Sequence, residues 1–265
     1  HQNILLEKTL RIEQSNRDVL YLFMKSLPHK PTVHILLIVI IGLLTYSNTF
    51  SVPFQFDDVS NIVENPAIRS FDYFLNPSKA ETVFRAYHHF KSRFIGYLTF
   101  ALNYKLHGFN VAGYHIFNLS IHIINALLIY WLVMLTLSHQ LSTVNFQHSS
   151  RSPMHPFTYS PLLVALLFVS HPIASQAVTY IVMRVASLAT MFYLLSLVAY
   201  IKSRLNNTQP TTRYALYVVS LISAVFAMKT KEISVTLPIT IMFYEFMFFK
   251  AAIRKRLVYL IPLLL

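Results

Sequence analysis

Long apolar runs are the feature that most constrains the fold of this 265-residue chain. A helix needs about 20 mainly apolar residues to cross the hydrocarbon core of a membrane. Because backbone polar groups inside a membrane must be bonded internally, we expect each run to be helical. The sequence therefore predicts an all-α, polytopic transmembrane helix bundle. Its expected spans are 33–50, 114–137, the shorter 161–170, 185–201, 214–228 and 233–249.

The composition agrees with a membrane protein. Hydrophobic residues make up 55% of the chain and charged residues only 12%, whereas an ordinary soluble domain is about 25% charged. The 22 Lys and Arg outnumber the 10 Asp and Glu, but basic residues beside apolar spans set topology and contact anionic lipid. We therefore expect membrane lipids, and not nucleic acid, as partners. The absence of Cys excludes disulfides, thiol catalysis and Cys-based metal sites.

The distribution of charge orients the bundle. More than half of the Lys and Arg residues lie before residue 33 or within 138–160, 202–213 and 250–256. Positive residues favour the cytoplasmic side, so the N-terminus is predicted to be cytoplasmic and the loop 51–113 non-cytoplasmic. We expect a multi-pass protein of the bacterial inner membrane. Its expected parts are a cytoplasmic amphipathic segment, 1–32, and a transmembrane domain, 33–265, whose last helix starts at Leu257 and is expected to be truncated.

The outer side of this topology collects acids and bases at the ends of spans. The loop 51–113 is expected to be structured, because "AIRSFDYFLN" and "RFIGYLTFALNYKLHG" carry apolar residues at helical spacing. A structured loop over a bundle whose mouth holds mixed charges predicts an active site. The candidates are Asp57 and Asp58 as catalytic acids, Arg93, His171, Arg184, Lys229 and Lys231 as donor-phosphate ligands, and Glu232 as a supporting residue.

These residue types suit sugar transfer from a polyprenyl-phosphate carrier. Phosphate is a good leaving group, so such an enzyme needs a carboxylate to deprotonate the acceptor hydroxyl and fixed cations to hold the departing phosphate. Neighbouring carboxylates repel, which raises the pKa of one, or they share a divalent cation. The sequence does not choose between these two arrangements for Asp57 and Asp58. No metal site and no cofactor are predicted, and the lipid-linked sugar is the expected donor substrate.

Four blocks of the chain resemble one family. They are "FQFDD", "RFIGYLTFALNYKLHGFNVAGYHIFNLSIHIINALLIYWLV", "SHPIASQAVTYIVMRVASLATMFYLLSLVAYIKSR" and "FAMKTKEISVTLPITIMFYEF". Together, across about 33–249, the chain resembles the membrane domain of GT-C fold glycosyltransferases with tetratricopeptide repeats, including the transmembrane and tetratricopeptide-repeat O-mannosyltransferases. The resemblance implies a GT-C type fold, a polyprenyl-phosphate-sugar donor, a protein hydroxyl acceptor and a catalytic acid at Asp57 or Asp58. The repeats that follow this domain in the family are absent from this chain.

The predicted function is therefore inverting protein O-glycosylation, similar to O-mannosylation, on the non-cytoplasmic face. The alternative is a catalytically silent membrane anchor or accessory subunit that keeps the fold and docks to a larger protein complex. A transporter is disfavoured because the polar residues gather at one mouth and not at the midplane. The first two are distinguished by whether Asp57 or Asp58 faces a cavity that also holds Arg or Lys.

Several of the candidate residues also have a purely structural interpretation. Arg93 can extend from an interfacial helix to water, and His171 can cap a helix before Pro172. Lys229 and Glu232 are spaced for an ion pair across one helical turn. A polar stripe inside the second span, formed by His115, Asn118, His122 and Asn125, is expected to pack against other helices. Glu245, inside the sixth span, is a functional candidate unless it reaches Lys250 or water.

Overall fold

The computed structural model describes residues 30–83, 87–143, 159–205, 209–249, 256 and 259–262 of the chain. Within these residues the regular structure is entirely helical, which confirms the predicted all-α class. The amphipathic segment expected at 1–32 lies almost wholly outside the described residues, as does most of the seventh apolar run.

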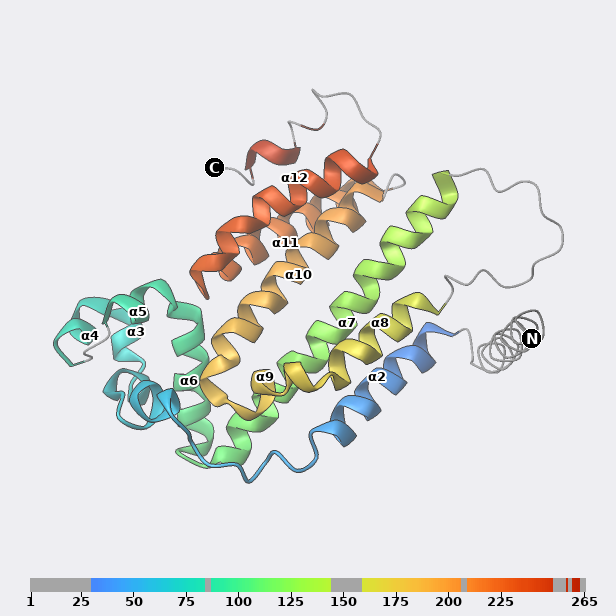
Figure 1. Cartoon of the computed structure of the whole chain (residues 1–265). Helices are drawn as coiled ribbons and strands as arrows, with labels where there is room; N and C mark the ends of the chain where they lie inside the picture. The colour runs from blue at the N-terminus through green and yellow to red at the C-terminus, as the bar shows by residue number, and fades with distance from the viewer. Residues whose placement is uncertain are drawn as a thin grey trace, which may run out of the picture.

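The helices of the bundle run lengthwise through the molecule (Figure 1). They are α2 (Pro31–Thr45), α7 (Val111–Thr143), α8 (Ser160–Ser170), α10 (Arg184–Leu205), α11 (Pro210–Met228) and α12 (Leu237–Phe248). Three helical segments of the described chain are long and apolar enough to cross a membrane: Val111–Gln140, Ile181–Leu205 and Pro210–Met228. These match the second, fourth and fifth expected spans.

The other expected spans are shorter or broken. Helix α2 is an apolar helix of 15 residues. Helix α8 ends at Ser170 because His171 adopts an extended conformation before Pro172, as expected for a residue that precedes proline. Together with the segment Pro172–Thr179, which follows at a 54° bend, α8 is apolar enough for a fourth crossing. The sixth run divides into the 3₁₀ helix η5 (Glu232–Thr236) and α12, whose first turn contains Pro238.

The lengthwise helices pack in two groups. Helices α2, α7 and α8 share one apolar core, and α10, α11 and α12 share another. Helix α10 joins them, because it packs extensively against both α11 and α7 (Figure 1). The close approach of α2 depends on Gly42, where a Cβ atom would lie 2.9 Å from the side chain of Ile123 and 3.1 Å from that of Val169. A larger residue would therefore push α2 away from α7 and α8.

The loop 51–110 folds into short helices that gather at one end of the bundle, as Figure 1 shows. These are η1 (Val59–Val63), η2 (Pro66–Arg69), α3 (Asp72–Leu75), α4 (Pro77–Val83), α5 (Tyr87–Ser92) and α6 (Phe94–His107). Aromatic residues, including Phe74, Phe90 and Phe100, form their core. This core extends to Ile181 and Val185, which belong to η4 (Ile181–Met183) and α10. The remaining short helices are η3 (Pro172–Ala174) and α9 (Gln176–Thr179).

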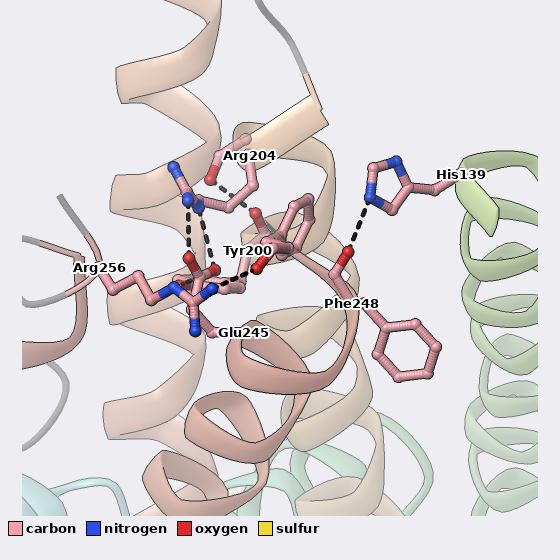
Figure 2. A network of polar contacts seen from close by, with 8 residues as sticks. His139, Tyr200, Arg204, Glu245, Phe248 and Arg256 are labelled. Carbon is pink, nitrogen blue, oxygen red and sulfur yellow. Dashed lines mark hydrogen bonds and ion pairs between the residues drawn. The ribbon is translucent and has the colours of Figure 1, made fainter. Parts of the chain in front are cut away.

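A buried ion pair ties the C-terminal ends of α10 and α12 together (Figure 2). Arg204 binds both carboxylate oxygens of Glu245, with Nη2–Oε1 at 2.6 Å and Nε–Oε2 at 3.0 Å, and Tyr200 donates to Oε2 at 2.9 Å. The Glu245 side chain is fully buried. Its partners are thus Arg204 and Tyr200, and the contacts of Glu245 are those of a structural residue.

Removing one partner from this pair should destabilise the protein more than removing both. We expect Glu245→Leu to cost about 3 kcal/mol, because the Arg204 guanidinium then keeps its burial without its anion. The double variant Arg204→Met, Glu245→Leu should recover most of that loss. Thermal unfolding of the purified protein in detergent measures both. A double variant that is less stable than Glu245→Leu would show that the pair contributes net stability.

Candidate functional site

A polar cleft of about 100 Å³ lies where the loop 51–110 meets the start of α10 and Lys231, the residue before η5. Three of the predicted site residues line it together: Asp57, Arg93 and Lys231. The other lining residues are Asn61, Tyr97, Phe100, Val182, Met183, Val185 and Ala186. One acid and two bases from three distant parts of the sequence therefore share one small space.

Asp57 reaches the cleft from a turn that starts with an unusual backbone conformation. Phe56 has φ = 46°, in the left-handed region that is uncommon for residues other than glycine. The backbone N–H of Asp57 then donates to the Tyr180 hydroxyl at 3.2 Å, and the Asp57 carbonyl accepts from Asn61 Nδ2 at 2.8 Å. The side chain of Asp57 remains exposed. Its backbone is thus fixed, and its exposed carboxylate lies beside the Tyr180 hydroxyl.

Asp58 has a different environment from its neighbour. Its side chain is fully buried, with Oδ1 accepting from Val182 N at 2.7 Å and Oδ2 from Gln55 N at 3.0 Å. Burial raises the pKa of Asp58, although the amide hydrogen bonds and the charge of His115 oppose this shift. Because its two oxygens bind the backbone amides of Gln55 and Val182, Asp58 connects the loop 51–110 to η4. Of the two predicted acids, Asp57 therefore has the better placed carboxylate for chemistry.

Arg93 and Glu232 form an ion pair beside the cleft. The Arg93 Nε lies 3.5 Å from Glu232 Oε1. The pKa of Glu232 is lowered, first by a hydrogen bond from Ser92 and further by Arg93. The sequence suggested an ion pair between Lys229 and Glu232 across one helical turn. The two residues do not share a helix, because α11 ends at Met228 and η5 begins at Glu232, and Glu232 pairs with Arg93. Glu232 therefore pairs with the Arg93 guanidinium at the edge of the cleft that Arg93 and Lys231 line.

A main-chain bond holds the two walls of the cleft together. The N–H of Ile95, at the start of α6, donates to the carbonyl of Lys229 at 3.2 Å. This bond places Arg93, two residues before Ile95, against the turn that carries Lys231. The side chain of Lys229 is exposed, and it is not among the residues that line the cleft. Lys231 is thus the better placed of the two predicted lysines.

Tyr97 and Asn61 were not anticipated from the sequence. The Tyr97 hydroxyl donates to Asn61 Oδ1 at 2.6 Å, and burial raises the pKa of Tyr97 to about 12, so the hydroxyl stays neutral at physiological pH. Tyr97 lies four residues after Arg93, a spacing that brings side chains to one face of a helix. The spacing of Tyr97 from Arg93 is therefore the sequence feature that could have identified Tyr97 as a residue of the site. Asn61 sits in the π-helical turn η1, which apolar periodicity does not reveal.

Arg184 is not placed as we predicted. It is fully buried, and its guanidinium donates to Asn118 Oδ1 at 2.7 Å, Tyr114 O at 3.0 Å and Thr99 O at 3.3 Å. The aromatic rings of Phe100 and Phe117 lie within 5 Å of its Cζ atom. The Arg184 donors are directed to α6 and α7 and not to the cleft. Its contacts therefore correct the predicted phosphate-binding role to a structural one.

His171 also lies apart from the residues that line the cleft. Its Nδ1 accepts from the Ile173 N–H at 3.2 Å and so caps η3. This geometry agrees with the structural interpretation of His171, and its donor-phosphate role stays a prediction from the sequence. The part of the chain that the structure describes contains no group of three or more His, Asp or Glu positioned to hold a metal ion.

An apolar groove of about 500 Å³ adjoins the cleft. It runs between α10 and η5, and its lining residues are Ala186, Ala189, Thr190, Tyr193, Leu194, Lys231, Ile233, Ser234 and Thr236. Ala186 and Lys231 line both the groove and the cleft. The arrangement can therefore hold one ligand with a long apolar part in the groove and an anionic group at Lys231.

Replacing Arg184 tests its structural role. We expect Arg184→Lys to destabilise the protein by roughly 2 to 4 kcal/mol, because an ammonium group cannot satisfy three acceptors spread over α6 and α7. The loss should appear in the thermal unfolding of the protein without any ligand. Unchanged stability, with weaker binding of a phosphate ligand, would instead restore the predicted phosphate role.

The backbone at Phe56 allows a second test of the site. We expect Phe56→Gly to keep or raise thermal stability, since glycine adopts a positive φ without strain and the Phe56 ring is 83% exposed. Phe56→Val should be less stable than the native protein by about 1 kcal/mol, because a β-branched residue is strained at this φ. Thermal unfolding of both variants decides; a valine variant as stable as the glycine variant contradicts the assigned strain.

Comparison with known proteins places the chain among relatives of one kind. It is 27% identical over 175 residues to the protein O-mannosyl-transferase F38B6.6 of Caenorhabditis elegans, covering 64% of this chain and 23% of that protein. It is 29% identical over 182 residues to Tmtc3 of Drosophila melanogaster, covering 66% and 20%, respectively. It is 31% identical over 166 residues to TMTC2 of Mus musculus, covering 61% and 18%.

No family model and no solved structure matches the chain. The chain spans about a fifth of the length of the curated relatives it matches. Those relatives are named protein O-mannosyl-transferases, as the four sequence blocks predicted. Over about two thirds of its length, the chain is therefore similar in sequence to proteins named TMTC-type protein O-mannosyl-transferases.

Proposed function

We propose that this chain is the membrane part of a glycosyltransferase that moves a sugar from a polyprenyl-phosphate carrier to a protein hydroxyl. The names of its relatives support O-mannosyl transfer to a protein acceptor. The observation that carries the proposal is that the polar cleft and the apolar groove share Lys231 and Ala186. A lipid-linked phosphate needs such a site, because its tail is apolar and its phosphate is anionic.

In this proposal the two halves of the donor occupy the two spaces. The polyprenyl chain lies in the groove along α10, and the phosphate lies at the junction beside Lys231 and Arg93. Arg93 and Lys231 supply the positive charge that stabilises the departing phosphate. Arg93 can also bind two phosphate oxygens at once, for which the guanidinium group is suited. The sugar then lies in the cleft on the side of Asp57.

The proposed reaction is a single displacement with inversion. The Asp57 carboxylate takes the proton of an acceptor Ser or Thr hydroxyl, whose oxygen forms a bond to the anomeric carbon of the sugar. The bond between that carbon and the phosphate oxygen breaks, and the electron pair leaves with polyprenyl phosphate. Asp58 holds the turn at Gln55 and Val182 and so positions its neighbour. Tyr97 and Asn61 line the cleft as neutral hydrogen-bonding groups for the sugar or acceptor hydroxyls.

We propose the non-cytoplasmic face for the reaction, because Asp57, Arg93 and Tyr97 of the loop 51–110 line the cleft. This loop gathers at one end of the bundle (Figure 1), and the sequence predicts that it is non-cytoplasmic. The three long apolar helices support a membrane location. The cytoplasmic N-terminus stays a prediction from the sequence. The bacterial inner membrane also stays a prediction, and the relatives named above are animal proteins. A catalytically silent anchor is disfavoured by the names of the relatives and by the acid and cations in one cleft.

Two matched variants test the proposed base. In the full-length protein, Asp57→Asn should lower the rate of sugar transfer by about 10² to 10⁴-fold, the usual contribution of a general base, and leave thermal stability unchanged. Asp58→Asn should lower stability, because an amide nitrogen would face a backbone N–H in place of a carboxylate oxygen. The assay measures donor-dependent labelling of a Ser- or Thr-containing acceptor with a polyprenyl-phosphate sugar. Full activity of Asp57→Asn would exclude it as the base.

A further inference from the structure

The groove beside the cleft contains hydroxyl groups as well as apolar side chains. Most of these hydroxyls are bonded within the protein. Thr190 donates to Ala186 O at 3.0 Å, and Thr236 donates to Ile233 O at 3.0 Å. Tyr193 shares hydrogen bonds with Thr236 and Thr240. These groups need no ligand to satisfy them.

Ser234 differs from them. Its side chain is fully buried, and its Oγ has no hydrogen-bond partner among the described residues. A serine in a helix usually bonds the carbonyl three or four residues earlier. In η5 the carbonyl three residues earlier, that of Lys231, already accepts from the Ser234 backbone N–H at 3.1 Å. The hydroxyl thus lines the groove with a hydrogen-bonding capacity that the protein itself does not use.

A buried hydroxyl without a partner is unfavourable, because it has lost its bonds to water. Its position identifies the kind of group that would satisfy it. Ser234 lies three residues after Lys231, and both line the groove that adjoins the polar cleft. Lys231 and Ser234 therefore line the same groove from one short segment of chain. A ligand whose anionic group binds Lys231 has the Ser234 hydroxyl nearby. The remaining lining of the groove suits an apolar chain.

We propose that Ser234 is a specificity-determining residue, whose hydroxyl donates a hydrogen bond to a phosphate oxygen of the lipid carrier. This inference rests on the proposed function and adds a preference of the site for phosphate carriers over alcohols. The apolar groove accepts any isoprenoid chain of suitable width, but the serine hydroxyl favours one that ends in a phosphate over one that ends in an alcohol. A hydrogen bond to a charged oxygen is stronger than one to a neutral oxygen, so the Ser234 hydroxyl favours the phosphate over the alcohol.

The test measures carrier binding by the purified full-length protein in detergent. The ligands are polyprenyl phosphate, the corresponding polyprenol, phosphatidic acid and inorganic phosphate. We expect Ser234→Ala to weaken polyprenyl phosphate binding about tenfold, as one charge-assisted hydrogen bond predicts, and to leave polyprenol binding unchanged. Ser234→Thr keeps a hydroxyl and should keep the affinity.

Ser203→Ala is the matched control. Ser203 is also fully buried, but its hydroxyl donates to Tyr200 O at 2.7 Å, and it is not among the residues that line the groove. We expect Ser203→Ala to bind polyprenyl phosphate as the native protein does. Ligand-free Ser234→Ala should unfold at the same temperature as the native protein or higher, because no internal hydrogen bond is lost. A lower unfolding temperature for ligand-free Ser234→Ala would overturn the inference.

The remaining outcomes separate the inference from the proposed function. If the native protein binds no polyprenyl phosphate, the proposed function fails and the inference fails with it. If the native protein and Ser234→Ala bind it equally, only the inference fails. An equal loss for polyprenol would show that Ser234 contacts the chain and not the phosphate. An equal loss for phosphatidic acid or inorganic phosphate would remove the specificity for an isoprenoid carrier.

Discussion

The end of the bundle that carries the loop 51–110 depends on the interactions of the buried Arg184 guanidinium. A charged group without solvent is costly unless each donor finds an acceptor. The acceptors here come from two helices, with Asn118 and Tyr114 on α7 and Thr99 on α6. Arg184 is also the first residue of α10. One side chain thereby fixes the start of α10 against both neighbours, and α10 carries a wall of both the cleft and the groove.

The position of the start of α10 determines how the side chains of Asp57 and Asp58 are oriented. The segment Ile181–Met183 directly precedes Arg184, so its backbone is held in place with the start of α10. Val182 then offers its N–H to the carboxylate of Asp58. Because successive side chains in a turn point in different directions, Asp58 is directed inward and Asp57 outward. The carboxylate of Asp58 is buried and bonded to backbone amides, whereas that of Asp57 is exposed and lines the cleft.

Long apolar runs predicted the all-α class and the three helical segments that are long enough to cross a membrane, because a span in lipid requires an uninterrupted apolar run. The polar stripe of the second span was also interpreted correctly, since Asn118 and Asn125 are buried and bonded to neighbouring helices. Charge at the ends of spans brought Asp57, Arg93 and Lys231 into one list of candidates. The same criterion failed to separate these residues from Arg184, because a sequence does not show whether a terminal arginine faces inward. Tyr97 and Asn61 were missed because neutral polar side chains carry no comparable signal.

The bond from the Ile95 N–H to the Lys229 carbonyl has a consequence for how this site can change. It joins two backbones, so apart from proline at position 95, which lacks the N–H, neither residue needs a particular side chain to form it. The spacing of the two walls is therefore set independently of the side chains that line them. Arg93, Lys231 and their neighbours can be exchanged for other residues while the frame keeps its width. Such a frame allows new ligand preferences to arise without a new fold.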